Sequence, residues 1–187
     1  MKHEGEWLLG ALGAAGAYLL AIMPERKHRA ERMKGIFYAH RGLHDLEAGV
    51  PENSMAAFAA AVEKGYGIEL DVQLTRDQIP VVFHDFTLKR VCSAEGRVKD
   101  YTFEELQQFS IEGTNQRIPE FADVLQLVNG AVPLLIELKC PDLGCEICRL
   151  TDQELQGYRG SYTIESFSPM ALLWYRRHRP EVPRGQL

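Results

Sequence analysis

Three motifs that mark large enzyme classes are absent from this chain of 187 residues. There is no G-x-S-x-G nucleophile elbow, no G-x-x-x-x-G-K-[ST] phosphate loop and no H-E-x-x-H zinc helix. The sequence therefore gives no support to a triad hydrolase, a nucleotide-loop protein or a zinc protease. It also contains no repeat of fixed period and no low-complexity tract, and its 45% hydrophobic and 25% charged residues are typical of one globular domain.

Positive charge is scarce. The chain has 21 Lys and Arg against 26 Asp and Glu, a net charge of −5, and residues 36–187 alone carry 15 basic and 22 acidic side chains, a net charge of −7. Binding of nucleic acid requires concentrated Lys and Arg, because the phosphate backbone must be neutralised. A nucleic-acid partner is therefore not expected.

Cysteine is also rare, with four residues in the chain. The spacing Cys140-x4-Cys145-x2-Cys148 is compatible with a metal site or a disulfide, but a fourth nearby ligand is missing and Cys92 is distant in sequence. The pattern favours reduced thiols in a cytoplasmic domain and leaves the other two as alternatives.

Charge is missing altogether from Trp7 to Met23, a stretch of seventeen residues that Pro24 ends. As a helix it would span about 25 Å, slightly less than the roughly 30 Å hydrocarbon core of a bilayer. A signal peptide is one alternative, because Ala15-Gly16-Ala17 has the A-x-A form, and a buried core helix is another. Glu4 and Glu6 in the leader disfavour a signal peptide, and the missing polar stripe disfavours a core helix. A single transmembrane helix is predicted.

Five basic residues follow this segment and one precedes it. The positive-inside rule then places the following domain in the cytoplasm. We expect residues 1–35 to form a membrane anchor with a basic linker, and residues 36–187 to form the catalytic domain of a single-pass membrane protein.

Strand-like and helix-like segments alternate after the linker. The predicted strands cover residues 36–39, 67–75, 80–84, 132–139, 162–167 and, incompletely, 184–187. The predicted helices cover residues 53–64, 103–109, 119–127, 145–155 and 168–178. Such alternation indicates parallel βαβ units, and both a doubly wound sheet and a (β/α)8 barrel fit it.

Two of the predicted strands carry charged residues on one face. In the strand that begins at Ile68, apolar residues alternate with Glu69, Asp71 and Gln73, so the three polar side chains point the same way. Glu137 and Lys139 share a face of a later strand. Because both faces of a parallel sheet are normally buried, crowded carboxylates there are costly unless a cation binds between them. Glu69, Asp71 and Glu137 are hard oxygen ligands suited to one Ca²⁺ or Mg²⁺ ion, whereas a solvated sheet face is the alternative.

His40 and His84 each lie at the end of a predicted strand, where barrel enzymes gather catalytic groups. Arg41 follows His40, and its guanidinium suits a phosphate. A carboxylate-bound metal, Arg41, Lys139 and two histidines together favour phosphodiester cleavage, with charge neutralisation and general acid–base transfer.

These residues belong to an ordered series of short motifs that resembles the glycerophosphodiester phosphodiesterase family. The motifs are His40-Arg41-Gly42, Pro51-Glu52-Asn53-Ser54, Glu69-Leu70-Asp71-Val72 with Thr75 and Asp77, His84-Asp85-Phe86-Thr87-Leu88, Glu137-Leu138-Lys139 and Ser166-Phe167-Ser168. The resemblance covers Ile36 to Leu187.

The resemblance implies a TIM barrel that hydrolyses small glycerophosphodiesters to glycerol 3-phosphate and an alcohol. It implies that the glycerol 2-hydroxyl attacks phosphorus and that water opens the resulting cyclic phosphate. It further implies an acid–base pair of His40 and His84, and phosphate contacts from Arg41 and Lys139. The implied metal ligands are Glu69, Asp71 and Glu137.

The predicted domain departs from the family in length. A (β/α)8 barrel takes about 250 residues, with about 200 near the lower limit, whereas residues 36–187 number 152. We therefore expect a TIM barrel truncated after about six strands. Two other functions stay open: a catalytically inactive, membrane-tethered interaction module, and a related sphingomyelinase-type phosphodiesterase. The sequence carries no signal for an oligomeric state.

Overall fold

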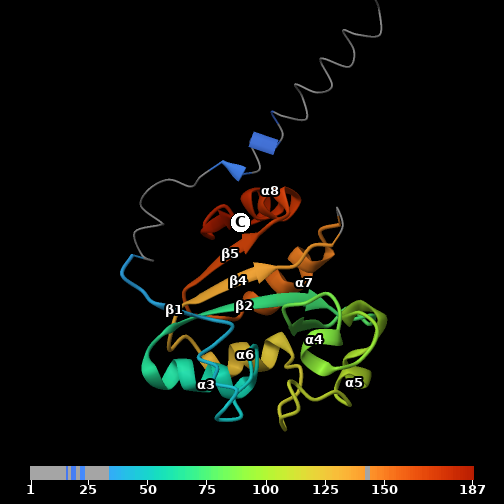
Figure 1. The fold of residues 1–187 in the computed structure, drawn as a ribbon. Helices are drawn as coiled ribbons and strands as arrows, with labels where there is room; N and C mark the ends of the chain where they lie inside the picture. The colour runs from blue at the N-terminus through green and yellow to red at the C-terminus, as the bar shows by residue number, and fades with distance from the viewer. Residues whose placement is uncertain (1–15, 17, 20–21, 24–33, 142–143) are drawn as a thin grey trace, which may run out of the picture.

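The structure is a computed structural model that describes residues 16, 18–19, 22–23, 34–141 and 144–187 (Figure 1). Most of the predicted membrane segment, Trp7 to Met23, and most of the basic linker lie outside these residues. Among the described residues, no helix is both long enough and apolar enough to cross a bilayer. The membrane anchor and the boundary at residue 35 stay predictions.

The domain is built on one six-stranded sheet. Five strands run parallel in the order β1-β2-β4-β5-β6, with bounds Tyr38–His40, Gly67–Leu74, Leu134–Leu138, Tyr162–Ser166 and Arg184–Gln186. Within the part of the chain that the structure describes, β1 and β6 form the two edges of this sheet. Helices connect the parallel strands, so the expected α/β architecture with a TIM-barrel-like parallel sheet is confirmed.

One predicted strand is not part of the parallel series. β3, Pro80–Val82, is antiparallel to β2 and forms a hairpin with it. The prediction of six parallel strands is wrong in this respect, because a connection of five residues, 75–79, is too short to carry the chain back to the start of a parallel neighbour. The turn is closed by Thr75 N–H, which donates to Ile79 O at 3.1 Å, and Gln78 adopts a φ of 65° within it. The described residues thus contain five parallel strands.

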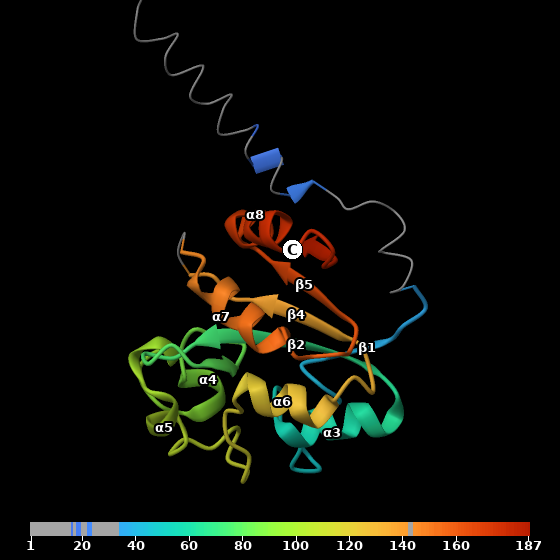
Figure 2. The same ribbon diagram turned by 180° about the vertical axis from the view of Figure 1, so that it is seen from behind.

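Four longer helices cover the outer side of the sheet: α3 Met55–Lys64, α6 Phe121–Val128, α7 Glu146–Leu155 and α8 Pro169–His178. Figures 1 and 2 show α3 and α6 near β1 and β2, and α8 near β5. The N-cap of α3 is Ser54, whose hydroxyl accepts from Ala57 N, and its C-cap is Gly65 in the left-handed conformation. The helix predicted over residues 53–64 thus ends at Lys64 as expected, and Ser54, one of its two candidate caps, precedes its first residue.

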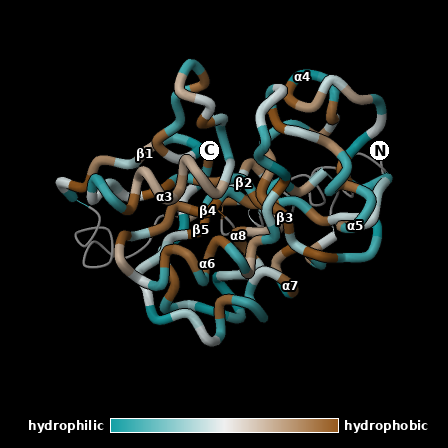
Figure 3. The backbone as a smooth tube through the Cα atoms, turned by 90° about the horizontal axis from the view of Figure 1, so that it is seen from below, coloured by the Kyte–Doolittle hydropathy of each residue, from teal (hydrophilic) through white to brown (hydrophobic). Residues whose placement is uncertain are grey.

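The main hydrophobic core lies between the sheet and these helices. Ile68, Leu70 and Val72 of β2 are fully buried there, as their alternation predicts. A second hydrophobic cluster lies under the connection of residues 83–118, which contains α4 Lys89–Cys92, a 3-10 turn η2 Val98–Asp100, and α5 Phe103–Leu106. Figure 3 shows the hydrophobic stretches along the strands and the helices packed on them. The opposite face of β2 is left for polar side chains.

Candidate active site

The polar face of β2 is buried. Glu69, Asp71 and Gln73 are 7%, 1% and 5% exposed, although each carries a charged or amide group. They alternate with the apolar residues that face the helices, so they point to the other side of the sheet, as predicted. The burial excludes a merely solvated sheet face.

The register of the parallel strands gathers the predicted metal ligands. Asp71 lies opposite Glu137 on β4, and His40 on β1 lies opposite Glu69. One carboxylate oxygen each from Glu69, Asp71 and Glu137 lies within 4.8 Å of the other two. In the part of the chain that the structure describes, this is the one group of carboxylate, imidazole or thiol side chains whose geometry suits a cation.

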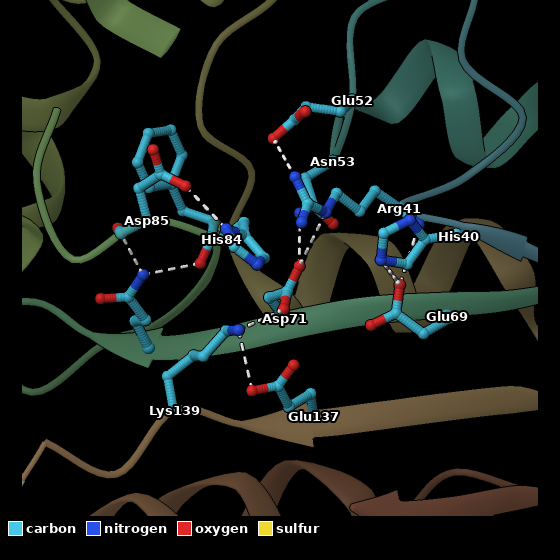
Figure 4. Close-up of polar contacts among 12 residues, drawn as sticks. His40, Arg41, Glu52, Asn53, Glu69, Asp71, His84, Asp85, Glu137 and Lys139 are labelled. Atoms are coloured by element: carbon cyan, nitrogen blue, oxygen red, sulfur yellow. Dashed lines mark hydrogen bonds and ion pairs between the residues drawn. The ribbon is translucent and has the colours of Figure 1, made fainter. Parts of the chain in front are cut away.

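Lys139 joins this group from the end of β4. Its Nζ lies 3.0 Å from Asp71 Oδ1 and 2.8 Å from Glu137 Oε1 (Figure 4). One ammonium thus balances only part of the charge of the three carboxylates. Lys139 was predicted to share a face with Glu137, and the structure confirms it.

Crowding of these carboxylates changes their acidity. Burial, and then the charge of Asp71, raises the pKa of Glu69 to about 8. Burial also raises the pKa of Glu137. Burial alone would raise the pKa of Asp71, but Lys139 and a hydrogen bond from Asn53 Nδ2 at 2.8 Å lower it overall. A hard divalent cation would offset the cost of ionising all three groups, so the donor set fits Ca²⁺ or Mg²⁺.

A tight turn after β1 places Arg41 above the carboxylates. Arg41 and Gly42 both have positive φ, 59° and 81°. This turn points the Arg41 backbone N–H at Glu69 Oε2, 2.9 Å away, and its Nη1 at Glu52 Oε1, 3.0 Å away. Arg41 Nε lies 3.9 Å from Asp71 Oδ2, is buried, and has no hydrogen-bond partner among the described residues. A buried donor without a partner suits an anion such as phosphate.

His40 ends β1, as predicted, and lies over Glu69 (Figure 4). Its Nε2 is 3.9 Å from Glu69 Oε2, while 70% of its side chain is exposed. Burial of the remainder, and then the charge of Arg41, lowers the pKa of this imidazole. His40 is therefore open to solvent on one side and to the carboxylates on the other.

His84 reaches the same place by a different route. β3 ends at Val82, so the prediction that a strand runs to His84 is wrong. The hairpin instead brings this segment back along β2, where Phe83 N–H donates to Asp71 O at 2.9 Å. Gln73 Nε2 then donates to Phe83 O and Asp85 O, at 2.7 and 2.8 Å. His84 Nδ1 lies 2.6 Å from Asp85 Oδ1, which leaves Nε2 free of that contact.

The structure adds site residues to which the sequence pattern assigned no role. Asn53 binds Asp71, Glu52 binds Arg41 and Asp85 binds His84. Glu165 on β5 lies opposite Glu137 in the register, and its charge acts on Glu69. Burial, and then the charge of Glu137, raises the pKa of Glu165 to about 7. The signal for Glu165 was the alternation of Ile164 with its charged neighbour, the same pattern that identified Glu137.

A groove of about 660 Å³ opens beside the carboxylates. Gln73 and Lys139, which lie beside the carboxylates, form part of its wall. The rest of the wall includes Phe86 and Cys140. Among the described residues the four cysteines form no disulfide, so the disulfide alternative is not borne out. The groove offers room for a small organic group next to the predicted phosphate contacts.

Comparisons with known proteins point to one family. A sequence model of the glycerophosphoryl diester phosphodiesterase family matches residues 40–187. A glycerophosphodiester phosphodiesterase of Caldanaerobacter subterraneus is 45% identical over 103 residues, which are 51% of this chain and 41% of the relative. One from Bacillus altitudinis is 41% identical over 109 residues, 54% of this chain and 43% of the relative. The chain thus spans less than half of either relative.

The fold resembles that of solved phosphodiesterases. The structure of an Oleispira antarctica phosphodiesterase, in complex with the product sn-glycerol-3-phosphate, superimposes with a TM-score of 0.76 at 28% identity. This match covers 84% of the present chain and 67% of the other. A glycerophosphodiester phosphodiesterase from Thermotoga maritima gives a TM-score of 0.65 at 27% identity, over 81% of this chain and 61% of the other.

Proposed function

The chain belongs to the glycerophosphoryl diester phosphodiesterase family, and from this premise we propose that it hydrolyses glycerophosphodiesters to sn-glycerol 3-phosphate and an alcohol. The observation that carries the proposal is the convergence of three buried carboxylates, Lys139 and Arg41 between two histidines. Similar proteins bear the name of this activity, and one of them binds sn-glycerol-3-phosphate.

The proposed binding step depends on charge. Glu69, Asp71 and Glu137 would hold one Ca²⁺ or Mg²⁺ ion, which supplies positive charge beside the phosphate when it is bound. Arg41 and Lys139 contact the phosphate oxygens from the protein side, and the buried Nε of Arg41 gains the acceptor that it lacks. The groove that Phe86 lines takes the alcohol moiety.

The proposed chemical step needs two proton transfers. As the glycerol 2-hydroxyl attacks phosphorus, one of His40 and His84 removes its proton, and the other protonates the oxygen of the departing alcohol. The product of this step is a cyclic phosphate, which water opens while the two histidines exchange roles. The Asp85 carboxylate accepts from His84 Nδ1, so Nε2 is the nitrogen of His84 that exchanges the proton with substrate.

The release of glycerol 3-phosphate from sn-glycero-3-phosphocholine, with Ca²⁺ or Mg²⁺ added, tests this function. We expect His84→Gln to lower kcat/KM at least about 100-fold, since acid–base catalysis contributes about 10²–10⁴-fold. We expect Glu137→Gln to have an effect of similar size, because it removes one charged ligand of the proposed cation and so weakens the charge stabilisation of the phosphate. His178→Gln and Glu104→Gln are matched controls on exposed positions of α8 and α5. If both His84→Gln and Glu137→Gln kept the kcat/KM of the wild type, the proposed mechanism would be excluded.

We further propose that residues 1–35 anchor the domain to a membrane, with the domain on the cytoplasmic side. The support is the uncharged stretch from Trp7 to Met23 and the basic residues after it. A membrane-impermeant thiol reagent added to intact cells should leave Cys145 unlabelled, whereas the same reagent should label it after lysis. Labelling in intact cells, or a mature N-terminus near Tyr18, would contradict this topology.

A further inference from the structure

Arg90, on the short helix α4, is the centre of an ion-pair network at the rim of the site. Its Nε donates to Asp85 Oδ2 at 2.7 Å, and its Nη2 donates to Asp85 Oδ1 at 2.8 Å. Nη2 also donates to Glu52 Oε1 at 2.6 Å, and Nη1 donates to Glu52 Oε2 at 3.1 Å. One guanidinium therefore binds all four oxygens of two carboxylates.

Each of these carboxylates makes a second contact, with a residue that faces the metal-ligand group. Asp85 Oδ1 accepts from His84 Nδ1 at 2.6 Å, and Glu52 Oε1 accepts from Arg41 Nη1 at 3.0 Å (Figure 4). Arg90 is thus one carboxylate away from a proposed acid–base group and one carboxylate away from a proposed phosphate contact.

We propose that Arg90 is a positioning residue that sets His84 through Asp85 and Arg41 through Glu52. The proposal rests on the proposed function for the roles of His84 and Arg41. Two nearby carboxylates repel each other, and each is free to rotate unless a cation fixes both. A planar guanidinium with several donors does this with defined geometry, which a single ammonium group cannot.

The acidity of the two carboxylates agrees with this role. The hydrogen bonds from Arg90, which outweigh burial, lower the pKa of Asp85 to about 2. Burial would raise the pKa of Glu52, but the contacts with Arg90 and Arg41 lower it overall. Both groups are therefore charged acceptors at neutral pH. Asp85 thus accepts the hydrogen bond of His84 without taking its proton, and Glu52 keeps its ion pair with Arg41.

The network also joins two separately packed parts of the domain. Glu52 lies on the loop that leads into α3, whose residues pack in the main core. Asp85 and Arg90 belong to the connection of residues 83–118, which has its own hydrophobic cluster. Arg90 therefore fixes the distance between the loop that carries Arg41 and the connection that carries His84.

The two contacts predict a separable effect on binding and on turnover. We expect Asp85→Asn to lower kcat about 10-fold or more while the Kd for sn-glycerol 3-phosphate stays within about twofold. Glu52→Gln should weaken the binding of sn-glycerol 3-phosphate, with a higher Kd, and should leave kcat nearly unchanged. Arg90→Gln should change both, because a misplacement of about 1 Å costs about 10²-fold in rate. Arg90→Lys should lose less kcat and less product affinity than Arg90→Gln, since an ammonium group reaches one of the two carboxylates but not both.

The control is Lys89→Gln, which removes the neighbouring positive charge of α4. Lys89 pairs with Glu95 and contacts neither Asp85 nor Glu52 in the structure. This variant should keep wild-type kcat and product affinity. A double variant, Arg90→Gln with Asp85→Asn, should lose less in kcat than the two single losses combined, because both act through His84.

An NMR measurement separates this proposal from the proposed function. In the wild type and in Lys89→Gln, a slowly exchanging Nδ1–H proton of His84 should be visible, hydrogen-bonded to Asp85. In Arg90→Gln the exchange of this proton should be faster, while circular dichroism shows an intact fold.

A wild type that neither binds sn-glycerol 3-phosphate nor turns over substrate would refute the proposed function, yet the proton signal of His84 would still test the role of Arg90. A wild-type signal in Arg90→Gln, or wild-type kcat and product affinity in that variant, would overturn the positioning role.

Discussion

Gly42 shows how a single residue determines the position of the site. With a φ of 81°, it completes the turn that points Arg41 at Glu69. A Cβ atom at this position would lie 2.8 Å from Ala57 Cβ and 3.0 Å from Phe58 Cδ1, both on α3. We predict that Gly42→Ala destabilises the domain by about 2–5 kcal/mol, because an overpacking cost of about 1–3 kcal/mol adds to a cost of about 1–2 kcal/mol for the positive φ. Urea unfolding monitored by circular dichroism measures the difference.

Gly49→Ala is the matched control for this prediction. Gly49 has a similar φ of 75°, but nothing lies within 4 Å of the position of its Cβ. It should lose only the conformational part, about 1–2 kcal/mol. Equal losses in the two variants would mean that the close approach of Gly42 to α3 has no energetic effect.

The carboxylates found from the sequence share one property: their charge interrupts an apolar strand. Glu69, Asp71 and Glu137 could be predicted because alternation in a parallel sheet fixes the side of each side chain. Glu165 has the same signal, but its strand reads less clearly because Tyr162 and Thr163 are partly polar. Glu52 and Asp85 lie on loops, where no periodicity reports direction, so their contacts with Arg41 and His84 required the structure.

At the scale of elements, the β2–β3 hairpin is the clearest difference between prediction and structure. Pro80 to Val82 reads as an apolar strand, and its apolar character is real, since all three residues are buried. Periodicity gives a strand but not its direction, which is fixed by the length of the connection. The short connection from Thr75 to Ile79 therefore indicates an antiparallel partner.

Helix α7 carries a carboxylate that disfavours the folded state above neutral pH. Burial, and then the charges of Glu120 and Asp123, raises the pKa of Glu154 to about 7 from 4.5. Its Oε2 is buried without a hydrogen-bond partner among the described residues. Because the folded-state pKa is the higher one, the folded protein favours the neutral acid. The contribution of Glu154 to the free energy of unfolding is therefore fully present below pH 4.5 and is lost as the pH rises through about 7.

We predict that Glu154→Gln stabilises the domain at pH 8 by about 1–2 kcal/mol, discounted for screening of a partly exposed group, and has little effect at pH 5. Chemical unfolding of wild type and variant at the two pH values gives the comparison. The matched control is Glu63→Gln, on the exposed side of α3, which should leave the free energy of unfolding close to that of the wild type. A variant that gains the same stability at both pH values would show that ionisation of Glu154 is not the cause.

At the scale of the whole molecule, the site exists only because the sheet assembles. Glu69 and Asp71 come from β2, Glu137 and Lys139 from β4, and His40 from β1, each brought into place by the register of neighbouring strands. The sequence could predict this convergence, because the carboxylates lie at similar depths of parallel strands. It could not give the number of parallel strands, since a short apolar segment does not reveal its direction.

A cation bound across β2 and β4 should therefore stabilise the domain as a whole, since it binds a site that the unfolded chain lacks. At a concentration of about 100 times Kd, Ca²⁺ or Mg²⁺ should add about 2.7 kcal/mol. For a chain of this size that corresponds to an increase in Tm of roughly 5–11 °C, which EDTA should reverse. Differential scanning calorimetry with and without the cation measures the shift.

Two variants show whether the stabilisation comes from the three carboxylates. Glu137→Gln should raise the stability of the metal-free protein, because it removes a buried carboxylate whose pKa is raised by burial, yet it should lose most of the cation-dependent increase in Tm. Glu104→Gln, on the surface of α5, should keep the full increase. If the cation raised the Tm of Glu137→Gln as much as that of the wild type, the ion would have to bind elsewhere, and the link between the metal and the β2–β4 register would be wrong.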